Sequence, residues 1–267
     1  MNYSFWQHIR RLEEDKAIIF RCRCINSCSM SQTTPQFERP LLRMGSIAFL
    51  AGLIIFVVST EFHASREDPT NHLRVFAEYA NSPPWIAAHI GQFVGGIVVF
   101  AGGFVALYRL LVQSESRTAS ALALIGFAVA ILSASALSIL QAVDGIALKR
   151  AVDSWASAPT VEKAAAFRVA EGIRWIEIGT NSIFRILQGT VAVIFGIAIA
   201  MSTQLSRWIG GAGVFAGAVT VAAGVEVAYI GFASSHAGLG AVSMIIYSIW
   251  VGILGIFMLR KTMSIRA

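Results

Sequence analysis

The sequence predicts an all-α protein, a polytopic bundle of six transmembrane helices with both termini in the cytoplasm. Hydrophobic residues make up 56% of the 267 residues and charged residues only 13%, whereas a soluble domain has about 25% charged residues. The mean hydropathy is +0.67. Six stretches are apolar over about 20 residues, the length that crosses the hydrocarbon core of a bilayer. Lipid is therefore the expected solvent of this chain.

The six predicted spans differ in their ionisable residues. The first, third and sixth carry no charge, the second contains His89, the fourth contains Arg185 and the fifth contains Glu226. The predicted spans cover about residues 44–60, 85–108, 119–143, 178–202, 208–233 and 237–259.

Lysine and arginine residues set the predicted orientation, because they are retained on the cytoplasmic side. The N-terminal segment, the short inner links and the C-terminus together hold 13 of them, and the other side holds seven. This bias places both termini inside and explains the net charge of +6 without nucleic acid. Residues 1–40 form a basic cytoplasmic tail without the apolar run of a signal peptide.

Residues 1–29 differ from the rest of the chain in being basic, aperiodic and the only cysteine-bearing segment. Three clustered cysteines, at positions 22, 24 and 28, are neither a disulfide framework nor a full set of metal ligands. Met30 is an alternative start, which would leave eight basic residues inside against seven outside.

Two predicted external loops have helical features. In the first, residues 71–80 form a short interfacial helix, and Pro83 and Pro84 precede Trp85 at the start of the second span. In the third, helical patterning continues to about Trp155 and resumes near residue 160. We expect an external helical hairpin continuous with spans three and four; the alternative is a frayed loop.

Polar residues inside the spans are expected to gather in the outer half of the bundle. Those of span four follow steps of three and four residues, so they share one face of a helix. A charge that faces lipid costs several kcal/mol, so this face points at other helices or at water. Arg185 and Glu226 lie at similar depths on consecutive spans and are predicted to pair. The predicted pocket residues are Arg174, Glu177, Asn181, Arg185, Gln188, Glu226, His89, Gln92, Gln141 and Asp144.

Four histidines fall on the predicted outer side, namely His63, His72, His89 and His236. Together with nearby carboxylates they could bind zinc, iron or manganese, because imidazole and carboxylate suit these ions. No His-x3-His or His-Glu-x2-His spacing is present, so interfacial histidines without a metal are the alternative. No nucleophile, Walker or Rossmann motif occurs either, and neither a cofactor nor catalysis is expected.

Small residues mark two helix faces, at Gly91-x3-Gly95 and Gly213-x3-Gly217. Such spacing lets membrane helices approach closely. These glycine-rich faces predict helix contacts within the bundle or self-association into a homo-oligomer.

Three stretches resemble a family of uncharacterised multi-pass bacterial membrane proteins. They are Glu61-Phe-His-Ala-Ser-Arg-Glu-Asp-Pro69, Gln141-Ala-Val-Asp-Gly-Ile-Ala-Leu-Lys-Arg150 and Trp175 to Gln188. The resemblance covers residues 44 to about 259 and implies a location in the bacterial inner membrane. It implies no activity and no functional residue.

Three functions remain open from the sequence. The first is binding or transport of a small ligand or ion through an outward-facing polar pocket. The second is a structural or sensory membrane component that docks a partner through the external hairpin. The third is a membrane enzyme that uses a metal ion.

Overall fold

The computed structural model describes residues 35–63, 69–232 and 236–264, and the chain divides into two units, Met1–Pro40 and Leu41–Ala267. The first unit corresponds to the predicted basic tail, and only its last residues, which begin the first described helix, are described. The predictions for residues 1–29 and their cysteines lie outside the described residues. The fold below is that of the second unit.

All regular structure in the described residues is helical, and two segments, η1 and η2, are π-helical. In chain order the elements are α2 (Pro35–Glu61), α3 (His72–Ala80), α4 (Trp85–Ile97), η1 (Val98–Phe104), α5 (Val105–Val112), α6 (Arg117–Ala142), η2 (Val143–Leu148), α7 (Lys149–Ser157), α8 (Lys163–Ala200), α9 (Arg207–Ile230) and α10 (His236–Ser264).

Six helical stretches are long and apolar enough to cross a membrane, which confirms the predicted number of spans. Their bounds are Arg39–Glu61, Trp85–Val112, Arg117–Ser157, Lys163–Ala200, Arg207–Ile230 and Gly238–Met263. The fifth ends at Ile230 and not at 233, because Gly231 leaves the helix with a φ of 67°, a conformation that favours glycine. The fourth ends at Ala200 and not at 202.

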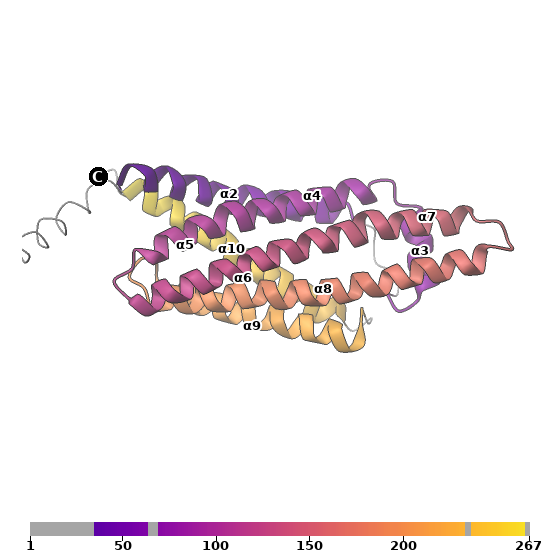
Figure 1. The fold of residues 1–267 in the computed structure, drawn as a ribbon. Coiled ribbons are helices and arrows are strands. Elements are labelled where there is room, and N and C mark those ends of the chain that lie inside the picture. Colours follow the sequence, from indigo (N-terminus) through magenta and orange to yellow (C-terminus); the bar gives the residue numbers. More distant parts are fainter. Residues whose placement is uncertain (1–34, 64–68, 233–235, 265–267) are drawn as a thin grey trace, which may run out of the picture. The chain divides into compact units, whose positions relative to one another are not determined.

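Two of the helical stretches are longer than a membrane requires. Arg117–Ser157 has 41 residues and Lys163–Ala200 has 38, which at 1.5 Å per residue gives about 60 Å for each, against a core of about 30 Å. Figure 1 shows α7 and the first turns of α8 running beyond the other long helices, with α3 beside them. The prediction of a short helix at 71–80 is confirmed by α3, which the Asn71 side chain caps by accepting from the Arg74 N–H.

A hydrophobic cluster packs α3 against α7 and the first turns of α8, which together form the α6–α8 extension. Phe76 is fully buried between Trp155 of α7, at a ring-centroid distance of 6.1 Å, and Phe167 of α8, at 5.5 Å. Trp85, also fully buried, stacks on Tyr79 at 3.9 Å. The cluster is built from the apolar face of the amphipathic helix α3, so this end of the unit has a core of its own.

Glycines bring the backbones of α8 and α9 into close contact. A Cβ atom added at Gly217 would lie 2.4 Å from the carbonyl oxygen of Gly189, and one at Gly210 would lie 2.5 Å from that of Gly196. On the other side of the bundle, Gly95 is equally tight against α2. The glycine-rich faces that could have served self-association are therefore covered by helices of the same chain.

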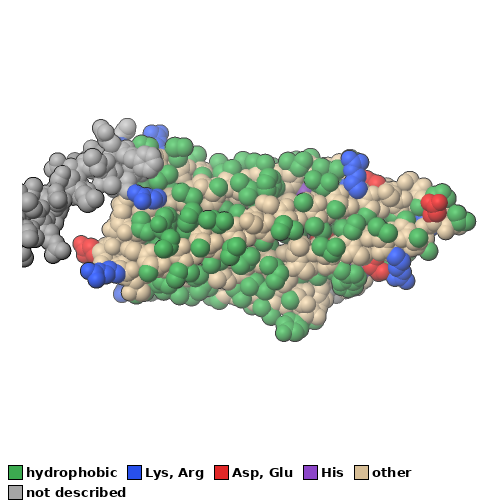
Figure 2. Space-filling model, in the orientation of Figure 1, with side chains coloured by type: hydrophobic (Ala, Val, Ile, Leu, Met, Phe, Trp, Pro, Cys, Tyr) green, Lys and Arg blue, Asp and Glu red, His purple; other side chains and the backbone are tan. Residues whose placement is uncertain are grey.

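Apolar side chains cover the outside of the bundle. Figure 2 shows hydrophobic side chains across the middle of one face and charged ones gathered toward its two ends. Ile54, Leu132 and Phe215 are 62%, 57% and 60% exposed. Such a surface is suited to lipid, and the chain is a multi-pass membrane protein.

Candidate functional site

A cavity of about 130 Å³ lies inside this apolar bundle, lined by residues from the spanning helices and by His63 just after α2. Six of the ten predicted pocket residues line it, namely Gln92, Gln141, Asp144, Asn181, Arg185 and Gln188. The other polar lining residues are Thr60, His63, Thr220, Ser243, Tyr247 and Ser248. The prediction that polar groups of different spans converge on one pocket therefore agrees with the structure for these residues.

Arg185 reaches across the cavity from α8 to α10. Its Nε donates to the Asn181 side-chain oxygen at 2.8 Å, and its Nη1 donates to the Gly240 carbonyl at 3.3 Å and the Ser243 hydroxyl at 3.2 Å. The predicted pairing of Arg185 with Glu226 stays a prediction. Glu226 lies on α9 and is not among the described residues that line the cavity.

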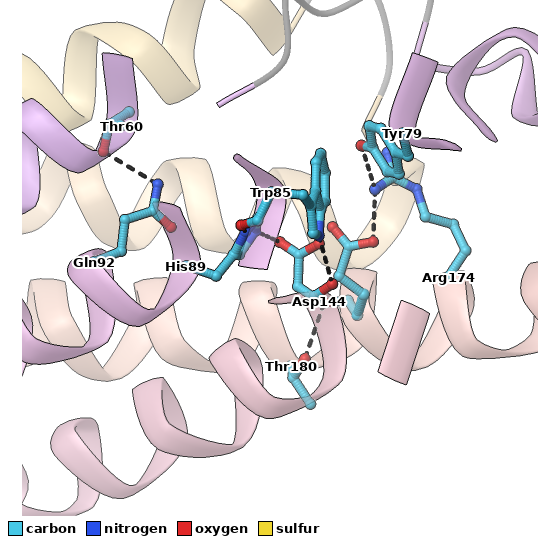
Figure 3. Close-up of polar contacts among 9 residues, drawn as sticks. Thr60, Tyr79, Trp85, His89, Gln92, Asp144, Arg174 and Thr180 are labelled. Atoms are coloured by element: carbon cyan, nitrogen blue, oxygen red, sulfur yellow. Dashed lines mark hydrogen bonds and ion pairs between the residues drawn. The ribbon is translucent and has the colours of Figure 1, made fainter. Parts of the chain in front are cut away.

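A second group of polar contacts joins α4 to the π-helical segment η2. His89 Nε2 lies 3.1 Å from the Asp144 carboxylate oxygen Oδ2, and His89 Nδ1 lies 2.7 Å from the carbonyl oxygen of Trp85. The Trp85 indole N–H donates to the backbone carbonyl of Asp144 at 3.1 Å. Figure 3 shows these three side chains together, with His89 and Trp85 on one helix and Asp144 on the other.

The π-helical turn explains why Asp144 faces α4. A π turn places one extra residue in the helix and frees a carbonyl from the regular ladder. Here the freed space is filled from α4, since a Cβ atom added at Gly145 would lie 2.4 Å from the Cβ atom of His89. The second π segment, η1, contributes Val99 and Phe100 to the cavity wall. Both irregular segments of the described chain thus adjoin the cavity.

A third polar group lies toward α3, outside the cavity lining. Arg174 and Glu177, each 3% exposed, form an ion pair of 2.5 Å, and Arg174 also donates to the Tyr79 hydroxyl at 3.0 Å. The Phe232 ring lies 4.8 Å from the guanidinium carbon. These two predicted pocket residues are therefore brought together with each other, and not with Arg185, as Figure 3 shows for Arg174 and Tyr79.

The predicted metal candidates separate in the structure. His63 and His89 come together with Asp144, and one potential ligand atom from each lies within 4.8 Å of the others. His72 instead pairs with Glu171 at 3.2 Å on the α3 side. The side chain of His236 lies outside the described residues.

Sequence reasoning missed three contributors to these groups. Tyr79 falls in the predicted interfacial helix 71–80 and Trp85 at the predicted start of the second span, yet both hydrogen-bond to residues of the polar groups. Thr60 accepts from the Gln92 amide at 3.2 Å. The amphipathic pattern of 71–80 could have indicated that Tyr79 faces the protein, whereas no signal in the sequence identifies Thr60.

No known protein family, curated protein or solved structure matches this chain. Its function is therefore argued from the cavity and the polar groups around it.

Proposed function

We propose that this protein binds a small polar or ionic solute in the intramembrane cavity, as a binding or transport protein of the bacterial inner membrane. The observation that carries the proposal is the cavity itself, which is lined by amides, hydroxyls, a guanidinium and a carboxylate from all six spans. The inner-membrane location follows the resemblance noted above and the charge bias of the loops.

The energetics favour an occupied cavity over a purely structural one. A polar group buried without a hydrogen bond costs about 1–3 kcal/mol, so a bundle held together by packing alone would be expected to avoid these residues. Two of the buried oxygens, Oε1 of Gln141 and Oδ1 of Asp144, have no hydrogen-bond partner within the described residues. Water or a polar solute in the cavity would satisfy them.

The cavity volume limits the solute. On the same measure one water needs roughly 10–15 Å³, so about 130 Å³ holds several waters or a small solute. An inorganic ion with part of its hydration shell or a small organic molecule meets this limit.

The predicted orientation makes the cavity accessible from outside. With both termini in the cytoplasm, His63, Asp144 and the α6–α8 extension lie at the outer end of the bundle. The extension then forms the external hairpin predicted from the sequence.

Cysteine accessibility tests the proposal. In a background with Ser at positions 22, 24 and 28, Ser248→Cys on the cavity wall, a partly exposed position, should react with a small charged methanethiosulfonate reagent added outside intact cells. Ile249→Cys is the matched control, because Ile249 is the next residue on α10 and is 58% exposed on the outer surface of the bundle. A thiol in hydrocarbon ionises poorly and should not react. Equal, negligible labelling at both positions would show that the cavity is closed or dry, and would refute the proposal.

A bound solute should also protect Ser248→Cys from labelling. Protection is measured with a panel of inorganic anions, divalent cations and small carboxylates, and the protecting solute identifies the ligand class. Uptake of that solute by cells or vesicles then separates transport from binding. The structural or sensory alternative predicts instead that modification of the hairpin by such reagents changes neither the binding nor the uptake of any solute.

A further inference from the structure

Three metal-ligating side chains converge at one end of the cavity. His63 follows α2, His89 lies on α4 and Asp144 lies on η2, and one potential ligand atom of each lies within 4.8 Å of the others. His89 Nε2 and Asp144 Oδ2 are already 3.1 Å apart. Adjacent ligands around a tetrahedral ion with bonds of about 2.1 Å are ~3.4 Å apart, so this pair has the spacing of two zinc ligands.

The hydrogen bond at the other ring nitrogen fixes how His89 can act. The Trp85 carbonyl oxygen is an acceptor only, so at 2.7 Å the Nδ1 atom of His89 must carry the proton. In the neutral ring the lone pair is then on Nε2 and faces the Asp144 carboxylate, which is also an acceptor. Two acceptors at 3.1 Å repel each other unless a cation, either a proton or a metal ion, lies between them.

Two further observations favour a metal ion over a proton. A proton on Nε2 would complete only the His89–Asp144 contact and would leave Asp144 Oδ1 and Gln141 Oε1 buried without a partner in the described part of the chain. It would also place an imidazolium beside the second imidazole, at a ring-centroid distance of 5.2 Å. A metal ion uses His63 and Asp144 as ligands, and Gln141 is one helical turn from Asp144.

The residues around His89 and Asp144 hold both side chains in the orientation that metal binding requires. A metal-binding histidine commonly donates its second N–H to a backbone carbonyl, which orients the ring and increases its basicity, and the His89–Trp85 bond has this arrangement. The Trp85 indole in turn holds the backbone carbonyl of Asp144 at 3.1 Å. Trp85 is fully buried, so both ligands are held by a rigid neighbour.

We propose that His63, His89 and Asp144 bind one divalent transition-metal ion, of the zinc class, at the end of the intramembrane cavity. Two imidazole nitrogens and one carboxylate oxygen are ligands that zinc uses, and the fourth position faces the cavity, where Gln141, water or a solute could complete the coordination. The proposal goes beyond the proposed function, because the metal site does not require a separate solute to bind.

Metal binding to the purified full-length chain tests this proposal. The background variant with Ser at positions 22, 24 and 28 removes the thiols that would otherwise bind metal. The protein is stripped with a chelator, loaded with Zn²⁺ or Co²⁺, desalted and assayed by elemental analysis and by the visible absorption of tetrahedral Co²⁺. We expect one ion per chain.

Three single variants locate the site. His63→Ala and Asp144→Asn should each weaken Zn²⁺ binding by more than ~100-fold, since loss of a direct ligand should exceed the 10–100-fold cost of losing a supporting contact. His72→Ala is the matched control, because His72 also lies beside a carboxylate, that of Glu171, but belongs to no group of three potential ligands among the described residues. It should bind like the background.

Zn²⁺ should also raise the thermal unfolding temperature of the background protein and of His72→Ala, but not that of His63→Ala. His63 is half-buried and follows α2 outside any helix, so His63→Ala should still fold. The test therefore remains valid if Asp144→Asn fails to fold. No stoichiometric ion in the background, or equal binding by His63→Ala, would overturn the proposal and leave a histidine–aspartate ion pair. Labelling of Ser248→Cys does not depend on metal, so failure of the cavity proposal would be seen separately.

Discussion

The buried Arg174–Glu177 pair allows a sharp test of how this bundle accommodates charge. Each residue is 3% exposed, and the guanidinium also contacts the Tyr79 hydroxyl and the Phe232 ring. Glu177→Ala leaves the cation buried with one hydroxyl and two ring faces around it. Breaking a buried ion pair costs about 3–5 kcal/mol, and because these contacts remain we expect a loss of about 3 kcal/mol in the free energy of unfolding.

The same helix provides the control. Arg168 and Glu171 have the same three-residue spacing, but the Arg168 side chain is 76% exposed, so Glu171→Ala should cost only about 1 kcal/mol even though it also removes the contact with His72. The Arg174→Met, Glu177→Met double variant removes both charges and should regain most of the loss. Reversible unfolding with SDS in mixed micelles, followed by tryptophan fluorescence, measures all three. If Glu177→Ala and Glu171→Ala cost the same within error, the pair is solvated and the reasoning is wrong.

Three further expectations concern helix packing and are measured by the same unfolding titration. Gly217→Val should destabilise the protein by more than about 2 kcal/mol, because the valine side chain would meet the Gly189 carbonyl of α8. Gly211→Val is the control, because a Cβ atom there meets nothing within 4 Å. Equal losses for the two variants would contradict the packing. Ser182→Ala removes the 2.9 Å bond to the Gly224 carbonyl and should cost about 0.6 kcal/mol; a loss above 2 kcal/mol would mean that the hydroxyl does more than bridge α8 and α9. Trp250→Phe removes the 3.1 Å bond to the Ile209 carbonyl together with buried ring area, so it should cost more than Ser182→Ala, and the reverse order would refute this ranking.

The number and approximate positions of the spans could be predicted because the cost of burying charge in lipid leaves a strong hydropathy signal. The face shared by Asn181, Arg185 and Gln188 could be predicted for the same reason. The sequence does not predict that the polar face of α8 is divided between two separate groups of contacts. From Arg174 to Gln188 it extends over about 20 Å, at 1.5 Å per residue, so its first turns reach α3 while its last turns reach the cavity.

The His63–His89–Asp144 group was also out of reach of sequence reasoning. These residues are far apart in the chain, and their meeting depends on how α2, α4 and η2 pack. Hydropathy does not register a π turn, since one extra residue leaves the apolar character of a span unchanged. Depth alone does not determine which face of α9 meets α8, because the glycine contacts between these two helices determine it.

The π-helical segment η2 makes the packing of the third span sensitive to the number of residues within it. A deletion of one residue within Val143–Leu148 would be neutral for hydropathy and would keep the span long enough to cross the bilayer. It would nevertheless restore regular α-helical winding and turn everything on one side of the deletion by about 100° relative to the other. Either Asp144 would leave His89 or the α7 face would leave Phe76, so chain length is fixed here by orientation and not by membrane thickness.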